Sequence, residues 1–203
     1  MERGKADDIY IATSGVGEIL SPRPIRPQAA RVGDLVLVSG DIGRHGMAVM
    51  AARERLGFEP PIKSDCAPLA GPVFALLDAG IDVHCLRDCT RGGLATALIE
   101  IANCSDVTIA IRQRDIPVSP PVRGACEILG LDPLYVANEG RFAAIVAAGN
   151  AKRALALLNR HGEDAAIIGK VVARHGGTSL KMETLGNDLA LDLQTGEQLP
   201  RIC

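Results

Sequence analysis

Cys203, the last residue of the chain, carries a thiol in a setting unlike that of a core residue. It follows Pro200, Arg201 and Ile202, and a terminal cysteine behind a Pro-Arg pair packs poorly into an apolar interior. We therefore expect residues 194–203 to form a flexible, exposed tail. Such a segment extends by about 3.3 Å per residue, which gives the thiol a reach on the order of 30 Å. Arg201 favours the nucleophilic thiolate and the terminal carboxylate opposes it. The pattern predicts a carrier thiol, with an incidental surface cysteine as the alternative.

A polar, glycine-rich segment ahead of an apolar stretch is a second candidate site. Its sequence is Asp88-Cys89-Thr90-Arg91-Gly92-Gly93. Successive glycines at a helix start let backbone N–H groups approach a phosphate, and the helix dipole favours an anion there. Arg91 can pair with phosphate oxygens, and Asp88 can hold Mg²⁺ or a ribose hydroxyl. The alternative is structural, since Asp88 and Thr90 can cap the helix while the glycines form a tight turn. The spacing is neither a P-loop nor GxGxxG.

A third candidate is a polar quartet between two apolar runs, Asn138-Glu139-Gly140-Arg141. The carboxylate of Glu139, beside a permissive glycine backbone, can act as a base or as a metal ligand. Turn chemistry explains Asn-Glu-Gly equally well, so the segment is either a site or a hairpin turn.

The elements that must position these segments alternate along the chain. Apolar periodicity, glycine and proline predict helices over residues 45–56, 68–79, 94–103, 121–129 and 151–160. Strands are expected over residues 8–13, 34–40, 83–86, 107–111, 133–137, 142–147, 165–173, 179–183 and 188–193. This order predicts a mixed α/β layer architecture. The segment at 88–93 then joins a strand to a helix, and the quartet at 138–141 joins two strands.

Composition excludes several classes of function. The chain has 203 residues, 47% hydrophobic and 23% charged, with a net charge of −2. That balance predicts no nucleic-acid partner and no membrane association, because neither a basic patch nor an apolar run of about 20 residues is present. The charged start, without an apolar signal core, predicts a cytoplasmic protein. The six cysteines form no CxxC pair and no zinc spacing, so we predict no metal site and mostly buried internal thiols. His45 either lines a site or caps a helix.

Together, these segments resemble the hydrogenase maturation factor HypE, a family within the PurM-like ATP-binding enzymes. The resemblance rests on residues 39–48, 87–95 and 138–141 and on the ending Pro200-Arg201-Ile202-Cys203, and it runs over essentially the whole chain. It implies an α/β, PurM-like C-terminal domain with a mixed sheet and covering helices, preceded by the last strands of a PurM-like N-terminal domain. Residues 1–43 would be the remnant of that ATP-binding, dimerising domain, residues 44–193 the C-terminal domain, and residues 194–203 the tail with the carrier cysteine.

The resemblance also implies a chemistry. A partner carbamoyltransferase, HypF, would carbamoylate Cys203, and ATP with Mg²⁺ would drive dehydration of the S-carboxamide to a thiocyanate. The cyano group would pass to iron on a HypC–HypD complex and become a cyanide ligand of [NiFe]-hydrogenase. Glu139 would be the base, or the group that orients it. By the same resemblance, the residues near ATP would be Asp88, Thr90, Arg91, Gly92, Gly93 and Asn138. The full-length family implies a homodimer.

The chain departs from the family pattern at two points. Cys89 stands where the family usually has proline, a change that we expect to be tolerated. The family also has an additional N-terminal region with aspartates that bind Mg-ATP. Met1 stands where an internal valine is common in the family, and one hypothesis is that the true gene extends upstream. Two hypotheses follow: an active ATP-dependent carbamoyl dehydratase, or a non-catalytic fragment that only carries the group or binds partners. A third, a thiol-dependent metal or redox protein, is disfavoured because Cys and His do not cluster.

Overall fold

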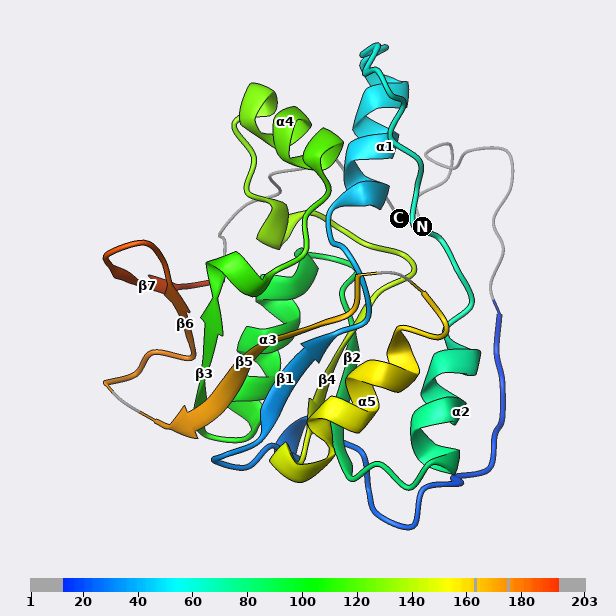
Figure 1. Cartoon of the computed structure of the whole chain (residues 1–203), viewed down its shortest axis with the longest axis vertical. Coiled ribbons are helices and arrows are strands. Elements are labelled where there is room, and N and C mark those ends of the chain that lie inside the picture. The colour runs from blue at the N-terminus through cyan, green and yellow to red at the C-terminus, as the bar shows by residue number, and fades with distance from the viewer. Residues whose placement is uncertain (1–12, 163, 175, 194–203) are drawn as a thin grey trace, which may run out of the picture.

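The computed structural model describes residues 13–162, 164–174 and 176–193 (Figure 1). Within them, seven strands form one sheet in the order β2-β4-β1-β5-β3-β6-β7. The strands are β1 (Leu35–Val38), β2 (Val83–Asp88), β3 (Val107–Arg112), β4 (Phe142–Val146), β5 (Ala166–Ala173), β6 (Leu180–Glu183) and β7 (Asp188–Leu191). The α-helices are α1 (Arg44–Arg53), α2 (Ala70–Asp78), α3 (Gly93–Cys104), α4 (Pro120–Leu129) and α5 (Ala151–Leu158). The expected α/β class, with a mixed sheet and covering helices, is confirmed. None of the described helices is long and apolar enough to cross a bilayer.

Helices cover the sheet on both faces (Figure 1). Strand β4 shows the reason, because its side chains alternate between two apolar clusters with the period of a strand. Ala143 and Ile145 belong to the cluster that contains α3, whereas Phe142, Ala144 and Val146 belong to the cluster that contains α2 and α5. Helices α1 and α4 lie beyond one end of the sheet, where Met47 and Val122 share a third cluster.

Pairing within the sheet brings three strand ends together. Strands β1 and β2 both run antiparallel to β4. The end of β1 therefore lies beside the start of β4, with Val38 opposite Ala143. The end of β2 lies there too, with Asp88 opposite Phe142. The segments that follow β1 and β2, and the segment that precedes β4, thus leave the sheet at the same edge.

Strand β1 is an interior strand, paired with β4 on one side and β5 on the other. The domain boundary expected after residue 43 falls between β1 and α1. It would assign β1 to a different domain from the strands with which it pairs. The division into segments 1–43, 44–193 and 194–203 stays a prediction, and most of the strand expected over residues 8–13 and the whole tail with Cys203 lie outside the described residues.

The strand expected over residues 133–137 is wrong, because a 3-10 helix, η3 (Pro133–Tyr135), stands there. The Asp132 carboxylate accepts a hydrogen bond from the N–H of Leu134 at 2.9 Å, and Pro133 occupies the first helical position. Such a local hydrogen bond competes with the hydrogen bonds between neighbouring strands of a sheet. The segment at 138–141 therefore does not join two strands as a hairpin turn, and its role as a site stays a prediction.

Candidate functional site

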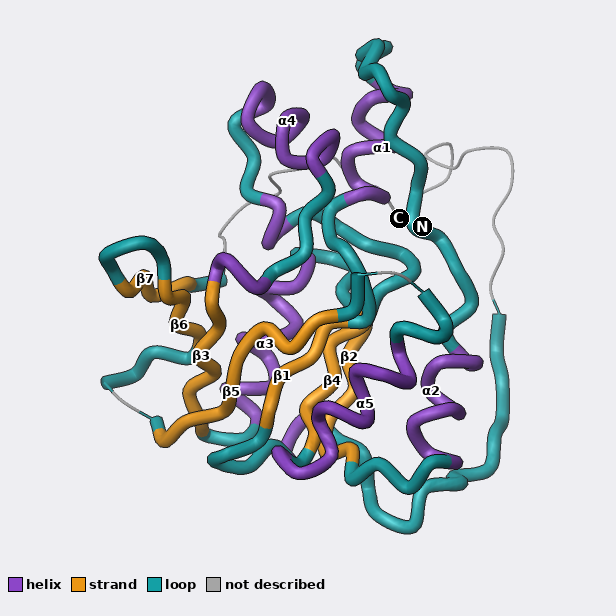
Figure 2. Tube along the Cα trace, in the orientation of Figure 1, coloured by secondary structure: helices purple, strands orange, loops and turns teal. Residues whose placement is uncertain are grey.

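Three segments that carry the resemblance, near residues 39–48, 87–95 and 138–141, converge at one edge of the sheet. We call residues 39–45, 88–93 and 138–141 the motif edge. The N–H of Ser39 donates to the carbonyl of Phe142, and the N–H of Cys89 donates to the carbonyl of Arg141, both at 3.0 Å. Figure 2 shows loops gathered at this end of the strands, between the sheet and α1. Residues about 50 apart in the chain thus become neighbours.

Asn138 joins the three segments of the motif edge. It is completely buried. Its Oδ1 accepts from the N–H of Gly43 at 2.7 Å, and its Nδ2 donates to the carbonyls of Cys89 and Val136 at 3.0 Å each. Its side chain thus bonds only to protein backbone in this structure. The place of Asn138 near ATP, which the resemblance implies, stays a prediction.

A residue that the sequence did not single out, Asp65, fixes the backbone of Glu139. Its carboxylate is buried, with 4% exposure. Oδ1 accepts from the N–H groups of Glu139 and Gly140 at 2.8 and 3.1 Å, and Oδ2 faces the N–H of His45 at 3.4 Å. The two backbones meet so closely that a Cβ on Gly140 would lie 1.9 Å from the carbonyl oxygen of Asp65. The only sequence signal was a polar residue ahead of a helix, which a cap explains equally well.

The side chain of Glu139 has unused hydrogen-bonding capacity. Its Oε1 is buried and has no hydrogen-bond partner among the described residues, and the same holds for Nε2 of His45. Buried polar atoms without partners are rare and costly. A carboxylate oxygen in this state can accept a hydrogen bond or a proton from a bound group.

Charged residues of the motif edge form ion pairs with one another. Asp41, 5% exposed, pairs through Oδ1 with Nη2 of Arg141 at 2.8 Å and through Oδ2 with Nε of Arg44 at 3.1 Å. Gly40 makes room for this cluster, since a Cβ there would lie 2.6 Å from Nε of Arg141. The pair between Asp41 and Arg141 holds the segment after β1 against the segment before β4.

The segment at 88–93 connects β2 to the first turn of α3. The Asp88 carboxylate pairs with Arg87 and accepts from Oγ1 of Thr90 at 2.8 Å. Burial acts to raise the pKa of Asp88, but the hydrogen bond from Thr90 and the charge of Arg87 outweigh it, and the pKa lies below its usual value. Asp88 is thus a carboxylate at neutral pH, and Arg91 is exposed beside it.

Both glycines at the start of α3 have left-handed backbones, with φ of 71° at Gly92 and 62° at Gly93. A Cβ on Gly93 would lie 2.5 Å from the carbonyl oxygen of Leu134. Packing against η3 therefore requires Gly93, whatever else the segment binds. The first turn of the 12-residue helix has no side-chain cap, so its dipole is available to an anion.

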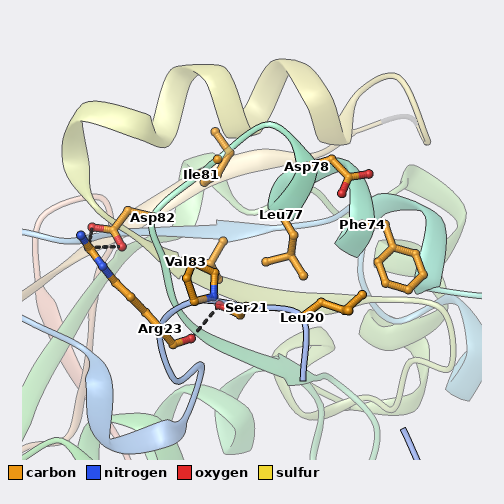
Figure 3. A pocket seen from close by; sticks show the side chains of 11 residues that line it. Leu20, Ser21, Arg23, Phe74, Leu77, Asp78, Ile81, Asp82 and Val83 are labelled. Carbon is orange, nitrogen blue, oxygen red and sulfur yellow. Dashed lines mark hydrogen bonds and ion pairs between the residues drawn. The ribbon is translucent and has the colours of Figure 1, made fainter. Parts of the chain in front are cut away.

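All predicted site residues in the described part of the chain lie at the motif edge. Cys203 lies outside the described residues. Among the described residues, no three His, Cys, Asp or Glu side chains are arranged to hold a metal ion. A groove of about 330 Å³ lies elsewhere, between residues 20–23 and α2. Figure 3 shows that Leu20, Phe74 and Leu77 line it and that Arg23 pairs with Asp82 at its margin. None of the predicted site residues lines this groove.

The fold and this edge define an α/β domain of the PurM-like class, with a polar site where β1, β2 and β4 meet. Residues 31–181 match the family model described as AIR synthase related protein, C-terminal domain. The chain therefore belongs to the AIR synthase-related family.

Individual relatives confirm the resemblance to HypE. The chain is 48% identical, over its whole length, to the carbamoyl dehydratase HypE of Azotobacter vinelandii and spans 60% of that protein. A crystal structure of the hydrogenase maturation protein HypE in complex with ATP superposes with a TM-score of 0.86 at 43% identity, covering 92% of this chain and 58% of that one. HypE in a HypE–HypF complex superposes with a TM-score of 0.79 at 42% identity, covering 84% and 56%.

Proposed function

We propose that this chain is the greater part of an ATP-dependent carbamoyl dehydratase that serves [NiFe]-hydrogenase maturation. The names of its relatives support the class of reaction, and the ATP complex of a similar protein supports the nucleotide. The substrate is the S-carboxamide carried on Cys203, and the product is the thiocyanate, the source of the cyanide ligands of iron.

The observation that carries this proposal is the unpartnered Oε1 of Glu139. Dehydration of a carboxamide removes two N–H protons, so the centre needs a fixed acceptor beside the amide nitrogen. The Asp65 carboxylate holds the N–H of Glu139, and the side chain of the preceding residue, Asn138, is fixed by its bonds to Gly43, Cys89 and Val136. Glu139 then accepts the amide proton while these bonds keep its carboxylate in place.

The segment at 88–93 fits a nucleotide phosphate. Arg91 is exposed beside the uncapped start of α3, and the Asp88 carboxylate is about half exposed. Bound ATP supplies the phosphoryl group that turns the amide oxygen into a leaving group. Arg91 and the first turn of α3 would hold phosphate oxygens. Asp88, with Thr90 bonded to it, would supply a carboxylate oxygen for Mg²⁺. Gly92 and Gly93 shape this turn.

The partners follow from the same chemistry. A HypF-like carbamoyltransferase loads Cys203, in line with the HypE–HypF complex of a relative. A HypC–HypD complex receives the cyano group, the complete protein is a homodimer, and the reaction takes place in the cytoplasm.

Intact-mass spectrometry tests the proposal. The chain is incubated with HypF, carbamoyl phosphate and ATP, and we expect a gain of one carbamoyl group followed by loss of one water. Cys203→Ala should show neither change. Carbamoylation without loss of water, on the chain extended to the full length of its relatives, would contradict the dehydratase and favour a carrier fragment.

A further inference from the structure

An exposed cysteine beside the motif edge has no part in the proposed dehydration. Cys66 follows Asp65, the residue that fixes Glu139, and its thiol is free and exposed. Its Sγ lies 3.7 Å from Nδ1 of His45. The pair joins a nucleophilic side chain to a base, which is the arrangement that activates a thiol.

The local backbone holds this pair in place. Ser64 Oγ accepts from the N–H of Cys66 at 3.1 Å and lies 2.9 Å from Nδ1 of His45. His45 belongs to the first turn of α1, and its own N–H faces Asp65 Oδ2 at 3.4 Å. One hydroxyl, that of Ser64, thus contacts both the imidazole and the backbone N–H of Cys66, and Nδ1 of His45 is shared between Ser64 Oγ and Cys66 Sγ.

The other described cysteines provide a contrast. Burial raises the pKa of Cys85 to about 11, of Cys89 to about 12 and of Cys126 to about 11. Cys104 is exposed like Cys66, but in the described part of the chain it has no hydrogen bond to a histidine. Cys66 alone among these five combines exposure with an imidazole at its sulfur.

We propose that Cys66, with His45 as its base, is a reactive thiol that takes up small disulfides and forms a modification site beside Glu139. The Cys66 thiol gives its proton to Nδ1 of His45, and the thiolate attacks one sulfur of the disulfide. A new S–S bond forms on Cys66, the old one breaks, and the other half leaves as a thiolate. Cys66 is oxidised and the incoming disulfide is reduced, so no further oxidant is required.

The consequence of the modification rests on the proposed function. An added group on Sγ stands next to the loop that holds Glu139 and Gly140, where the carboxamide of Cys203 must arrive. S-thiolation of Cys66 therefore obstructs dehydration. Disulfides of small thiols would therefore inhibit the dehydration, although Cys66 takes no part in that reaction.

Labelling with dithiodipyridine, a neutral aromatic disulfide, tests the reactivity independently of that function. In a Cys203→Ser background, peptide mapping should find Cys66 modified on the order of tenfold or more faster than Cys104. Cys66→Ser should abolish the fast phase, and Cys104→Ser should preserve it. His45→Gln should slow Cys66 toward the rate of Cys104, while Cys85, Cys89 and Cys126 stay slow and report an intact fold.

Equal labelling rates for Cys66 and Cys104 in the parent would overturn the proposal, and this result does not depend on the histidine variant. An unchanged Cys66 rate in a folded His45→Gln chain would overturn the role of the imidazole. The obstruction is tested by labelling the carbamoylated protein before adding ATP. We expect slowed loss of water in the parent and none of this slowing in Cys66→Ser. If neither protein loses water, the proposed function fails while the labelling result stands.

Discussion

Two buried acidic residues at opposite ends of β1 show how a structural polar cluster differs from a site. Asp34 precedes the strand and Asp41 follows it, and each is 5% exposed. Both carboxylates are paired, Asp34 with His84 at 2.7 Å and Asp41 with Arg141 at 2.8 Å. By burial and pairing alone, the two ends are equivalent.

They differ in the groups around the carboxylates. At the Asp34 end, Asp34 also accepts from the N–H of Arg31 at 2.8 Å, and the remaining nitrogen of His84 lies 3.4 Å from Asp82. At the Asp41 end, Glu139 Oε1 and His45 Nε2 have neither a hydrogen bond nor an ion pair within the described residues. His84 Nε2 also lacks a hydrogen bond, but it faces the Asp82 carboxylate, whereas no charged partner in the described part of the chain faces Glu139 Oε1 or His45 Nε2. We therefore take the Asp34 end as the structural end and the Asp41 end as the candidate functional end.

The largest expected effect is that of removing the carboxylate that organises the site. Asp65→Ala leaves two or three backbone N–H groups without an acceptor, and we expect a loss of about 3 kcal/mol in the free energy of unfolding. Glu139 should also lose its position, so dehydration should stop in the molecules that remain folded. Urea denaturation and intact-mass kinetics measure the two effects.

Asp34→Ala is the matched control, since it removes an equally buried carboxylate at the structural end. It should destabilise the fold to a similar extent and leave the rate of dehydration per folded molecule intact. Equal loss of dehydration in both variants would show that the two ends do not differ as described.

A smaller effect is expected from adding a side chain at Gly140, where two backbone segments are in close contact. In Gly140→Ala the new methyl group would overlap the carbonyl of Asp65, so the loop must shift at a cost of about 2 kcal/mol. Gly149→Ala, where no atom lies within 4 Å of the new Cβ, should change stability by less than about 0.5 kcal/mol. The urea midpoints of the two variants measure the difference. Indistinguishable midpoints would contradict the tight contact between residues 65 and 140.

The smallest effect is a pH dependence at the structural end. Burial acts to raise the pKa of Asp82, but hydrogen bonds from Arg23 and its charge outweigh it, so the pKa lies below its usual value. Because the pKa is lower in the folded state, the contribution to stability is present above the unfolded value and is lost as the pH falls through the folded one.

Arg23→Gln removes this contribution, which is at most about 1 kcal/mol because the Arg23 side chain is mostly exposed. Parent and variant should therefore differ at about pH 6 and converge toward about pH 3. Urea denaturation at each pH provides the comparison. A difference that grows on acidification would contradict this sign.

Much of the fold could be predicted because apolar periodicity determines the elements locally. The uninterrupted run at β4 predicts a strand covered on both faces, and the glycines after α4 and before α3 limit those helices. The failure at 133–137 came from one side-chain bond of Asp132, which competes with strand pairing. Periodicity does not register such a bond.

The parts of the candidate site could be predicted only to some extent from the sequence. Segments 88–93 and 138–141 have unusual composition, and the structure brings them to one edge. Asp65 could not be predicted, because its bonds reach residues 74 and 75 positions away. Its role arises only when the loop before α2 folds onto the start of β4.

The carboxylate of Glu139 carries the central claim, and Glu139→Gln tests it most directly. The amide keeps the shape of the side chain but cannot accept a proton, so loading of Cys203 should be unchanged and loss of water should fall by at least about 100-fold. Intact mass after addition of ATP should show the carbamoylated form persisting in the variant and disappearing in the parent. Loss of water at the parental rate in Glu139→Gln would contradict the account.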